Sequence, residues 1–592
     1  MCGINGFTFS DKDLIQKMKL FTKRRGPDAD GIFISEEITI SHDRLSIIDL
    51  SNHANQPMER DNLVLSFNGE IYNYKELKKE LENDGFQFKT NSDSEVILLL
   101  FLKHNIESFK KLRGIFAISI WDKNLKKLYL IRDIVGVKPL YYFRDKNNLF
   151  FSSSIRSLLI SQKNKRMNFN AFMNYANFGR NDLKETIFKD IFKLRPGELI
   201  IKSKDSFSSQ KFLNFDFSKK KLNNDEIKYD IKKQINNQLV SDVPLGLSLS
   251  GGVDSNVIYS VMREKFNKRF NIYSFYFDDY EKFNQDFNVA KTNSNYFGNN
   301  FIPINIGHKD FIENAEKVVE ILEEPSGNQC SILNYTMSKN IKEKILITGD
   351  GGDETFTGYD RYRSIYIIQL LQKFNFLKKF DPQFKNKNFN RLFMTNPKDL
   401  FLSFSEQNLY RNSHLYYKNF DYIQKDQLSL NHTINHSFEN RLNAISFLDL
   451  DTVVPNEYLL RNDKIFANEG IEVRVPLLDE NIINNHLNIN EHKKFGYKIQ
   501  SKSLLKKLFK KEIHSLTKQK WGMQSPYGKW MKNILQKFVN EILCEEYYNN
   551  SKNYFNFTEI RKLVKTHQTH YQNPDIIWSL VMMQIFLRKF KL

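Results

Sequence analysis

Cysteine is scarce in this chain. Its 592 residues include three cysteines, Cys2, Cys330 and Cys544. An odd and sparse set of this kind excludes the disulfide framework on which small secreted proteins depend, and it fits a reducing compartment. The sequence also lacks the paired cysteines of a zinc or sulfur site.

Long apolar runs are missing as well. The longest strongly apolar runs, such as residues 96–102, are far too short to cross a bilayer. The opening residues MCGINGF carry neither the basic segment nor the apolar stretch of a secretory signal. We therefore expect a soluble, cytoplasmic protein with no membrane insertion.

The composition is that of a folded protein with an excess of positive charge. It is 41% hydrophobic and 27% charged, and the length favours two or more domains. The net charge of +19 could indicate a nucleic-acid or membrane-surface partner. The abundance of Lys and Asn favours instead a solvated, lysine-rich surface that reflects coding bias, so nucleic acid is not an expected partner. The oligomeric state stays open, and a homodimer is one possible assembly.

The N-terminal third of the chain consists mainly of short strand-like runs separated by turn signals, with helix patterns at residues 74–83 and 94–104. Many short strands and few helices predict packed antiparallel sheets. A polar stretch rich in Ser and Lys, about residues 202–225, then predicts a linker. The predicted strands are residues 38–41, 63–67, 116–121, 127–131, 140–143, 149–152 and 198–201.

Beyond this stretch, strands and helices alternate. Such alternation predicts a parallel, doubly wound sheet. From residue 362 onward the pattern is mostly helical, without internal repeats or low-complexity tracts. The predicted elements are helices at residues 226–240 and 255–266 and strands at residues 245–249, 272–277 and 344–348.

Cys2 directly follows the initiator methionine. A residue this small permits removal of Met1, which would place the thiol on the residue that carries the free α-amine. That amine has an ordinary pKa of about 7.7–8.0, so near neutral pH it can act as the base that activates the thiol. Most cysteines at this position are ordinary small residues, but the segments described next make Cys2 a candidate catalytic nucleophile.

Four further segments follow in order: RGPD at 25–28, RLSIID at 44–49, FNGEIYN at 67–73 and SDSE at 92–95. Each alone could be a surface ion pair or a hairpin turn. Together with CGI at 2–4 they resemble the class II glutaminase domain, in which a thiolate attacks the glutamine carboxamide and releases ammonia. The resemblance implies an N-terminal nucleophile fold of the α+β class, with two antiparallel sheets between helices.

The resemblance also assigns roles to residues of these segments. The Asn68 side chain and the Gly69 backbone amide would stabilise the tetrahedral oxyanion. Arg44 would pair with the α-carboxylate of glutamine, and Asp93 would hold its α-ammonium. The implied glutamine-binding residues are Arg44, Ile47, Asn68, Gly69, Glu70 and Asp93.

The segment SGGVDS at 250–255 follows a predicted strand and opens a predicted helix. In this context backbone amides and a helix N-terminus bind phosphate. The segment has no Gly-Lys-Ser/Thr and so is not a Walker A loop. It resembles the pyrophosphate loop of ATP pyrophosphatases, which split ATP between the α and β phosphates. Asp254 would be a ligand for Mg²⁺, a cation that prefers oxygen.

A second loop, TGDGGDE at 348–354, also follows a strand, and ligands of doubly wound sheets gather at these strand ends. The resemblance implies that Asp353 is a Mg²⁺ ligand and that adenylate formation depends on Asp350, where many relatives carry Glu. Lys502 would lie near the adenylate and stabilise negative charge in the transition state, unless it is one more solvated lysine. Backbone groups near Leu249, Phe277 and Gly349 would bind adenine. The implied positions for ATP and pyrophosphate are Leu249, Ser250, Gly251, Gly252, Asp254, Ser255, Phe277, Thr348 and Gly349.

Taken together, the chain resembles the glutamine-hydrolysing asparagine synthetases over nearly its whole length, least so at residues 362–444. The resemblance implies a glutaminase domain at 1–210, a linker at 211–225 and a synthetase domain at 226–592. The synthetase domain would be an α/β doubly wound ATP-pyrophosphatase domain with a helical C-terminal part. The implied substrates are glutamine, ATP and a carboxylate, with Mg²⁺ as cofactor and an interior channel for ammonia.

Three departures leave the acceptor carboxylate open. Asn256 replaces the second Ser common after the pyrophosphate loop, and residues 284–295 lack the Asp-Glu pair that relatives often carry. Residues 324–331 lack the Arg with which enzymes acting on aspartate typically bind the α-carboxylate. Aspartate therefore competes with a uronic acid or another carboxylate of surface polysaccharide biosynthesis.

Two hypotheses from other classes also stand. A basic tRNA-modifying adenylating enzyme would explain the SGGVDS loop and the charge, but it would leave Cys2, Arg44, Asn68 and Asp93 unexplained. A non-catalytic relative would keep the fold as a scaffold, and the intact reactive positions argue against it.

Overall fold

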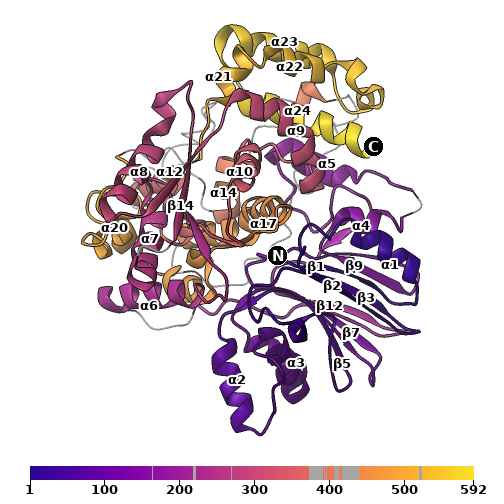
Figure 1. Ribbon diagram of the computed structural model, residues 1–592. Helices are drawn as coiled ribbons and strands as arrows, with labels where there is room; N and C mark the ends of the chain where they lie inside the picture. The colour runs from indigo at the N-terminus through magenta and orange to yellow at the C-terminus, as the bar shows by residue number, and fades with distance from the viewer. Residues whose placement is uncertain are drawn as a thin grey trace.

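The computed structural model describes residues 1–162, 164–217, 222–267, 270–372, 391, 394, 396–405, 413–416, 438, 441–518 and 523–592. These residues form two six-stranded antiparallel sheets and one five-stranded parallel sheet. The antiparallel sheets lie in an N-terminal part, residues 1–217, and the parallel sheet lies in a C-terminal part, residues 222–592 (Figure 1). The predicted fold class is confirmed.

The first antiparallel sheet has the order β10-β8-β9-β1-β3-β2, and the second has the order β12-β11-β7-β6-β5-β4. The two sheets pack against each other face to face. Ile4 and Ile40 of the first sheet share one apolar cluster with Val64 and Leu130 of the second. The strands of the first sheet are β1 (Gly3–Phe7), β2 (Ala29–Ile34), β3 (Thr39–Arg44), β8 (Tyr141–Asp145), β9 (Asn148–Ser152) and β10 (Phe192–Lys193). Those of the second are β4 (Met58–Arg60), β5 (Leu63–Ile71), β6 (Gly114–Asp122), β7 (Lys127–Arg132), β11 (Glu198–Lys202) and β12 (Phe207–Lys211).

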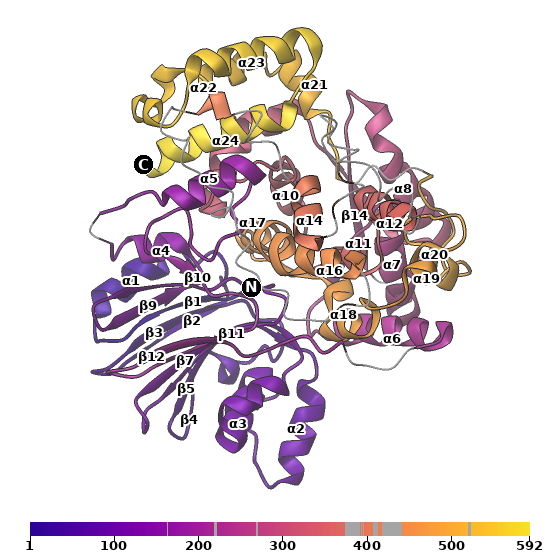
Figure 2. The same cartoon turned by 180° about the vertical axis from the view of Figure 1, so that it is seen from behind.

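Helices cover the outer faces of both sheets. The helices α1 (Lys12–Lys19) and α4 (Ile155–Leu159) pack on the first sheet, and α3 (Asp93–His104) packs on the second together with α2 (Tyr74–Asn83). Another helix, α5 (Phe169–Phe178), leaves this arrangement and lies beside the C-terminal helices in both views (Figures 1 and 2). This layered architecture places the chain start at the junction of the two parts (Figure 1).

The parallel sheet has the order β15-β14-β13-β16-β17. In such a sheet the loops after β13 and its neighbour β16 emerge at the same edge, which brings the two glycine-rich segments together. The strands are β13 (Leu245–Ser248), β14 (Asn271–Tyr276), β15 (Asn300–Asn305), β16 (Ile345–Ile347) and β17 (Glu472–Arg474).

Helices surround this sheet and form most of the remaining described chain. They include a ten-residue π-helix, Asp449–Tyr458, that leads directly into α17. The helices near the sheet are α6 (Asn224–Asn237), α7 (Val253–Phe266), α8 (Gln285–Phe297), α9 (His308–Leu322), α10 (Cys330–Ser338) and α11 (Gly352–Thr355). Those that follow are α12 (Asp360–Gln372), α14 (Pro397–Ser405), α16 (Arg441–Leu448), α17 (Leu459–Ala467), α18 (Glu480–His486), α19 (Glu491–Phe495), α20 (Ser503–Leu508), α21 (Tyr527–Lys532), α22 (Gln536–Ile542), α23 (Phe557–His570) and α24 (Pro574–Phe590).

The element predictions need three corrections. The prediction of a linker from residue 202 is wrong for β12, which pairs with β11 at the sheet edge. Helix α6 begins at Asn224, before the predicted start, because Asn223 and Glu226 form a capping box. The sequence patterns also missed the short strands β1, β2, β4, β10, β15 and β17.

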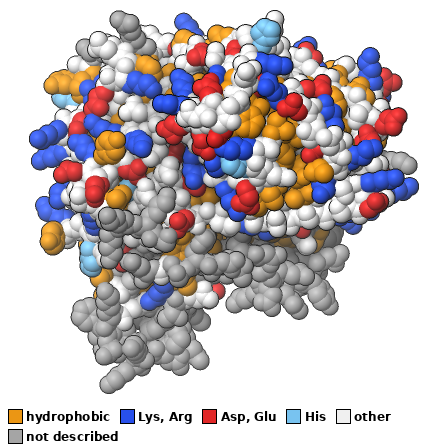
Figure 3. Space-filling model, turned by 90° about the horizontal axis from the view of Figure 1, so that it is seen from below, with side chains coloured by type: hydrophobic (Ala, Val, Ile, Leu, Met, Phe, Trp, Pro, Cys, Tyr) orange, Lys and Arg blue, Asp and Glu red, His pale blue; other side chains and the backbone are white. Residues whose placement is uncertain are grey.

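Some predictions lie partly or wholly outside the described residues. This applies to most of the weakly matching segment 362–444. Among the residues that are described, no helix is long and apolar enough to span a membrane. Lys and Arg side chains are interspersed with Asp and Glu over the face seen in Figure 3, in line with a solvated charged surface.

Candidate functional site

Cys2 lies at the entrance to β1, at the junction of the two parts. Its backbone N–H donates a hydrogen bond to Asn68 Oδ1 at 2.9 Å, and its Sγ lies 3.9 Å from the carbonyl oxygen of Leu45. Its own carbonyl accepts a hydrogen bond from Arg25 Nε at 3.0 Å. The thiol is therefore held beside Asn68, one of the residues predicted to act with it.

Met1 precedes Cys2 in the structure and is buried. Burial lowers the pKa of the Met1 α-amine to about 5 and raises the pKa of the Cys2 thiol. Removal of Met1 would turn the Cys2 nitrogen, which already contacts Asn68 Oδ1, into the α-amine. The same contact would then orient that amine next to the thiol.

Asn68 and Gly69 lie near the end of β5 with geometry suited to an oxyanion. The Asn68 Nδ2 atom is buried and, within the described part of the chain, has no hydrogen-bond partner. An unmet buried donor is costly unless a ligand uses it. Gly69 has φ +148°, and a Cβ there would lie 1.9 Å from the Ile115 carbonyl oxygen, so the position requires glycine.

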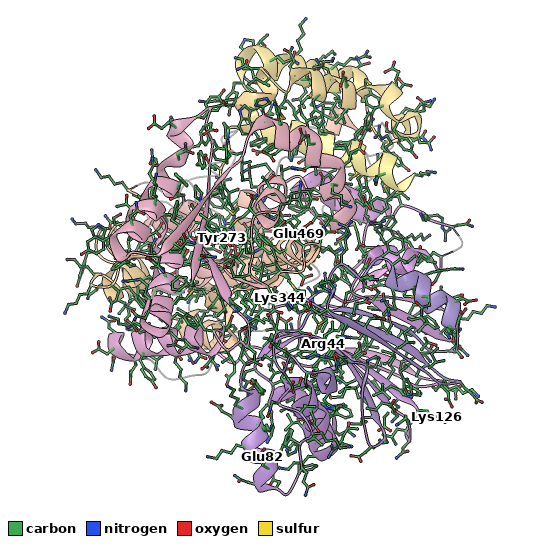
Figure 4. All side chains as sticks on the ribbon, in the orientation of Figure 1. Arg44, Glu82, Lys126, Tyr273, Lys344 and Glu469 are labelled. Carbon is green, nitrogen blue, oxygen red and sulfur yellow. The ribbon has the colours of Figure 1, made fainter. Side chains whose placement is uncertain are left out.

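Arg44 ends β3 and reaches into the loop that follows. Its Nη1 donates to the Ser51 carbonyl at 2.8 Å and to Asn55 Oδ1 at 2.7 Å, and Nη2 contacts the carbonyl oxygens of Ile48 and Asp49. In the residues covered by the structure no carboxylate pairs with this buried guanidinium. Figure 4 shows Arg44 near the junction of the two parts, below Lys344.

Asp93, the first residue of α3, is a buried carboxylate, and the hydrogen bonds that it accepts from described residues all come from neutral donors. Its Oδ2 accepts a hydrogen bond from the Ile71 amide at 3.0 Å, and burial raises its pKa to about 6. Glu70 is also buried, with Oε1 3.7 Å from Arg474 Nη2, and burial and the nearby Asp93 raise its pKa. The carbonyl of Ile47 accepts a hydrogen bond from the Asp242 amide at 3.1 Å. Glu70 on β5 and Asp93 on α3 therefore lie on adjoining elements. The Ile47–Asp242 hydrogen bond links the Ile47 loop to the C-terminal part.

The SGGVDS loop connects β13 to α7 in the predicted context. Gly252 occupies the N-cap position of α7. Because glycine has no side chain, no N-cap side chain bonds the first backbone amides of this helix. The Ser255 hydroxyl accepts a hydrogen bond from the Ser250 amide at 3.1 Å. Asn256 Nδ2 donates to the carbonyls of Ser250 and Gly252 at 3.0 and 2.7 Å, so this departure from the family pattern braces the loop.

The second glycine-rich loop packs against the first. A Cβ at Gly352 would lie 2.5 Å from the Asp254 carboxyl carbon, and one at Gly349 would lie 2.9 Å from the Ser255 amide. Asp254 and Asp353 both contact Lys502 Nζ, the latter at 2.5 Å, and the two carboxylates raise the pKa of this buried lysine. Two carboxylates that converge on one cation match the donors that hold Mg²⁺ alongside substrate phosphates, so these residues fit the predicted metal.

The other predicted synthetase residues lie at the ends of neighbouring strands. Asp350 Oδ2 accepts hydrogen bonds from the Thr348 hydroxyl at 2.6 Å and from Asn462 Nδ2 at 2.8 Å. The Leu249 amide donates to the Tyr273 carbonyl. Phe277 is buried, and the Asn284 side chain binds both its amide and its carbonyl, so an adenine there would have to share the carbonyl.

Two buried ion pairs join the two parts of the chain, and the sequence patterns did not predict them. Lys138 pairs with Glu472 at 3.1 Å, and Arg25 pairs with Asp463 at 2.8 Å. The first of these pairs joins residues 334 positions apart. Glu472 opens the segment EVRVPLLD at 472–479, and nothing local in the sequence points to its partner.

Glu323 and Glu324 form further contacts between the two parts. Glu323 Oε2 accepts a hydrogen bond from the Ile155 amide at 2.7 Å and pairs with Lys464 at the same distance. Glu324 pairs with Lys193 at 3.2 Å. The start of the segment that lacks Arg is therefore occupied by interdomain contacts.

Comparison with known proteins gives matches over both parts. Residues 226–588 match the asparagine synthase family, and residues 1–213 match the glutamine amidotransferase domain. The glutamine-hydrolyzing asparagine synthetase 1 of Bacillus subtilis (strain 168) is 29% identical, over 99% of this chain and 96% of that protein. Asparagine synthetase B of Escherichia coli (strain K12) is 28% identical over 61% of this chain and 65% of its own. A protein of Gibberella zeae named amidase chry2 is 26% identical over 62% of this chain and 60% of its own.

Proposed function

The chain belongs to the asparagine synthase family and is a glutamine-hydrolysing amidotransferase of the ligase class, and we propose the following chemistry for it. Cys2 hydrolyses glutamine to glutamate and ammonia. The C-terminal part uses ATP to adenylate an acceptor carboxylate, and ammonia then converts the adenylate to an amide with release of AMP. Pyrophosphate leaves in the adenylation step.

One observation carries the glutaminase half of this proposal. Asn68 contacts the Cys2 nitrogen through Oδ1 and leaves Nδ2 buried without a partner among the described residues. Attack of the thiolate on the carboxamide produces an oxyanion, for which Asn68 Nδ2 and the Gly69 amide are the proposed donors. The α-amine of Cys2 would take the thiol proton and pass it to the departing ammonia.

Glutamine itself would be held through its charged end. Arg44 would bind the α-carboxylate and Asp93 the α-ammonium, because neither shows a described partner of opposite charge. Ile47 and Glu70 would complete this site, with the Ile47 loop held in place by Asp242.

The ATP site would lie over the two glycine-rich loops. Ser250, Gly251, Gly252 and Ser255 would bind phosphate at the start of α7. Asp254 and Asp353 would hold Mg²⁺, which neutralises phosphate charge when bound. Lys502 would stabilise charge that develops during adenylation, and adenylate formation would depend on the acid at Asp350. The adenine contacts would come from backbone groups near Leu249, Phe277 and Gly349, and Thr348 fixes Asp350.

The proposal includes domain boundaries at 1–210 and 226–592, with residues 211–225 between them. It also includes a cytoplasmic location. Aspartate is the acceptor suggested by the names of relatives, and a uronic acid is the alternative.

Coupled product analysis tests the proposed function. Purified full-length protein with glutamine, ATP, Mg²⁺ and an acceptor is expected to form glutamate, AMP and pyrophosphate together. Failure to form glutamate from glutamine, with or without ATP, would refute the proposal. Salt-sensitive binding of tRNA in the absence of glutaminase activity would favour the tRNA-modifying alternative instead.

A further inference from the structure

A cavity of about 490 Å³ opens where the N-terminal part meets the C-terminal helices. From the N-terminal part it is lined by Gly179 and Arg180, which follow α5, and from the C-terminal part by Asn328, Glu457 and Tyr527, among others. The Gly327 amide donates a hydrogen bond to the Gly179 carbonyl at 2.8 Å, and Tyr175 of α5 bonds the Ser579 carbonyl of α24 at the same distance. The two parts therefore build the walls of this cavity together.

The cavity adjoins the proposed adenylation centre through Arg461. Arg461 Nη1 pairs with Glu457 in the cavity wall at 2.7 Å. The next residue, Asn462, donates to Asp350 at 2.8 Å. A ligand that fills the cavity and reaches past Glu457 would thus present one end beside Arg461 and Asp350.

Two arginines in and beside the cavity have unmet hydrogen-bonding capacity. Arg180 pairs with Asp182 through Nε at 2.9 Å, but its buried Nη2 has no partner among the described residues. The same is true of the buried Nε of Arg461. Neither arginine lies in the segment 324–331, where the family pattern places one, so these two could take over the recognition of an anionic acceptor.

The size and lining of the cavity favour an acceptor larger than aspartate. Cavities of about 300–1,000 Å³ enclose drug-sized ligands, and aspartate is much smaller. Carboxylates of Glu457 and Asp575 accept hydrogen bonds, Arg180 donates them, and Asn328 and Gln524 can do both. Glu457 and Asp575 already accept hydrogen bonds from Arg461 and from the Tyr527 hydroxyl, and Arg180 Nε donates to Asp182, so the capacity left for a ligand lies in the remaining carboxylate lone pairs and in Arg180 Nη2. Several hydroxyls on one molecule would satisfy both kinds of group.

Aromatic rings complete the lining. Phe178, Phe283, Tyr458 and Tyr527 supply flat apolar surface beside the polar groups. A ring with apolar C–H faces and hydroxyls at its edge fits such a mixture. We propose that this cavity is the acceptor site and that it takes a cyclic polyhydroxy carboxylate, the chemistry of a hexuronic acid, with its carboxylate beside Arg461. This inference rests on the proposed function.

An acceptor panel tests the inference. Full-length protein receives glutamine, ATP and Mg²⁺ with aspartate, free glucuronic or galacturonic acid, or the same acids linked to a nucleoside diphosphate. Pyrophosphate release at equal concentration is expected to be at least tenfold faster with a uronic acid than with aspartate. The free and nucleotide-linked forms distinguish the two sources of this chemistry.

Two variants localise the site. Arg180→Gln is expected to raise the KM for the uronic acid at least tenfold, and Gln524→Ala, a milder change at a more exposed position, to raise it severalfold. Glutamate release without acceptor is measured in both variants to report on the integrity of the glutaminase site. Arg166→Gln, at an exposed arginine of the same part, serves as the matched control and should leave the KM unchanged.

The outcomes separate this inference from the function on which it rests. ATP cleavage driven by aspartate and not by uronic acids would overturn the inference alone, as would an unchanged KM in both variants. Absence of glutamate release from glutamine would overturn the proposed function and the inference with it.

Discussion

The backbone nitrogen of Cys2 and the side-chain oxygen of Asn68 are joined by a 2.9 Å hydrogen bond. This contact fixes the orientation of the Asn68 amide, because accepting through Oδ1 turns Nδ2 toward a buried position where it has no described partner. A single side chain can then hold the nucleophilic residue and donate to the oxyanion. Both of these roles depend on the same rotamer of the Asn68 side chain.

Replacement of Asn68 should therefore affect catalysis more than binding. Asn68→Ala is expected to lower the kcat of glutamine hydrolysis by about 10²–10³-fold, the usual effect of losing one oxyanion donor. The KM for glutamine should change little, since Arg44 and Asp93 remain. Steady-state kinetics of glutamate release check this, with Asn62→Ala as the control because, among the described residues, the Asn62 side chain bonds Asp122 and no residue of the proposed site. A loss confined to KM would contradict the assignment.

Glutamine binding should weaken in acid. Burial raises the pKa of Asp93 to about 6, so below this pH the carboxylate is protonated and loses the charge that holds the α-ammonium. The Kd for glutamine of a Cys2→Ala variant, which cannot turn over, should rise about tenfold for each pH unit below 6. Calorimetric titration measures it. Asp93→Asn should bind weakly and without this pH dependence, and an equal dependence in that variant would refute the role of Asp93.

Asp353 should set the metal requirement. The carboxylates of Asp254 and Asp353 both contact the ammonium group of Lys502. Removal of one carboxylate weakens the electrostatic attraction for any cation at this position. Asp353→Asn is expected to raise the Mg²⁺ concentration for half-maximal pyrophosphate release at least tenfold and to spare glutaminase activity. Asp360→Asn, at the start of α12, is the matched control. An unchanged Mg²⁺ requirement would remove Asp353 from the metal site.

The Arg25–Asp463 pair should stabilise the junction. Both side chains are buried, and Arg25→Met would leave the Asp463 carboxylate without its cation. The expected cost is about 3–5 kcal/mol in the free energy of unfolding. Urea denaturation of the full chain measures it against Arg166→Met, where the arginine is exposed. A cost below about 1 kcal/mol, in the range of surface pairs, would contradict a structural role.

Local patterns predicted several elements well. Helix α2 spans the predicted residues 74–83, because its apolar residues recur at helical spacing and bury Leu77 and Leu81. The glycine-rich loops lie at adjacent strand ends as predicted, since parallel strands order their carboxyl ends along one edge. Short strands such as β17 were missed because three residues carry too little periodicity to distinguish them.

The contacts between the two parts could not be predicted in the same way. Lys138 and Glu472 are far apart in sequence, and their pairing depends on how two separately patterned units dock. Arg180 reaches the acceptor cavity for the same reason, since α5 leaves the N-terminal sheets to pack beside α24. The sequence reveals the missing arginine at 324–331 but not the positions that could replace it.

The central claim is a division of labour between Cys2 and the ATP site, and a Cys2→Ala variant tests it most directly. Amide formation and pyrophosphate release are measured with either glutamine or ammonium as the nitrogen source, using the acceptor that is active in the wild type. The account predicts loss of glutamine-dependent activity and retention of ammonium-dependent activity. Loss of both activities, or full retention of the glutamine-dependent one, would contradict it.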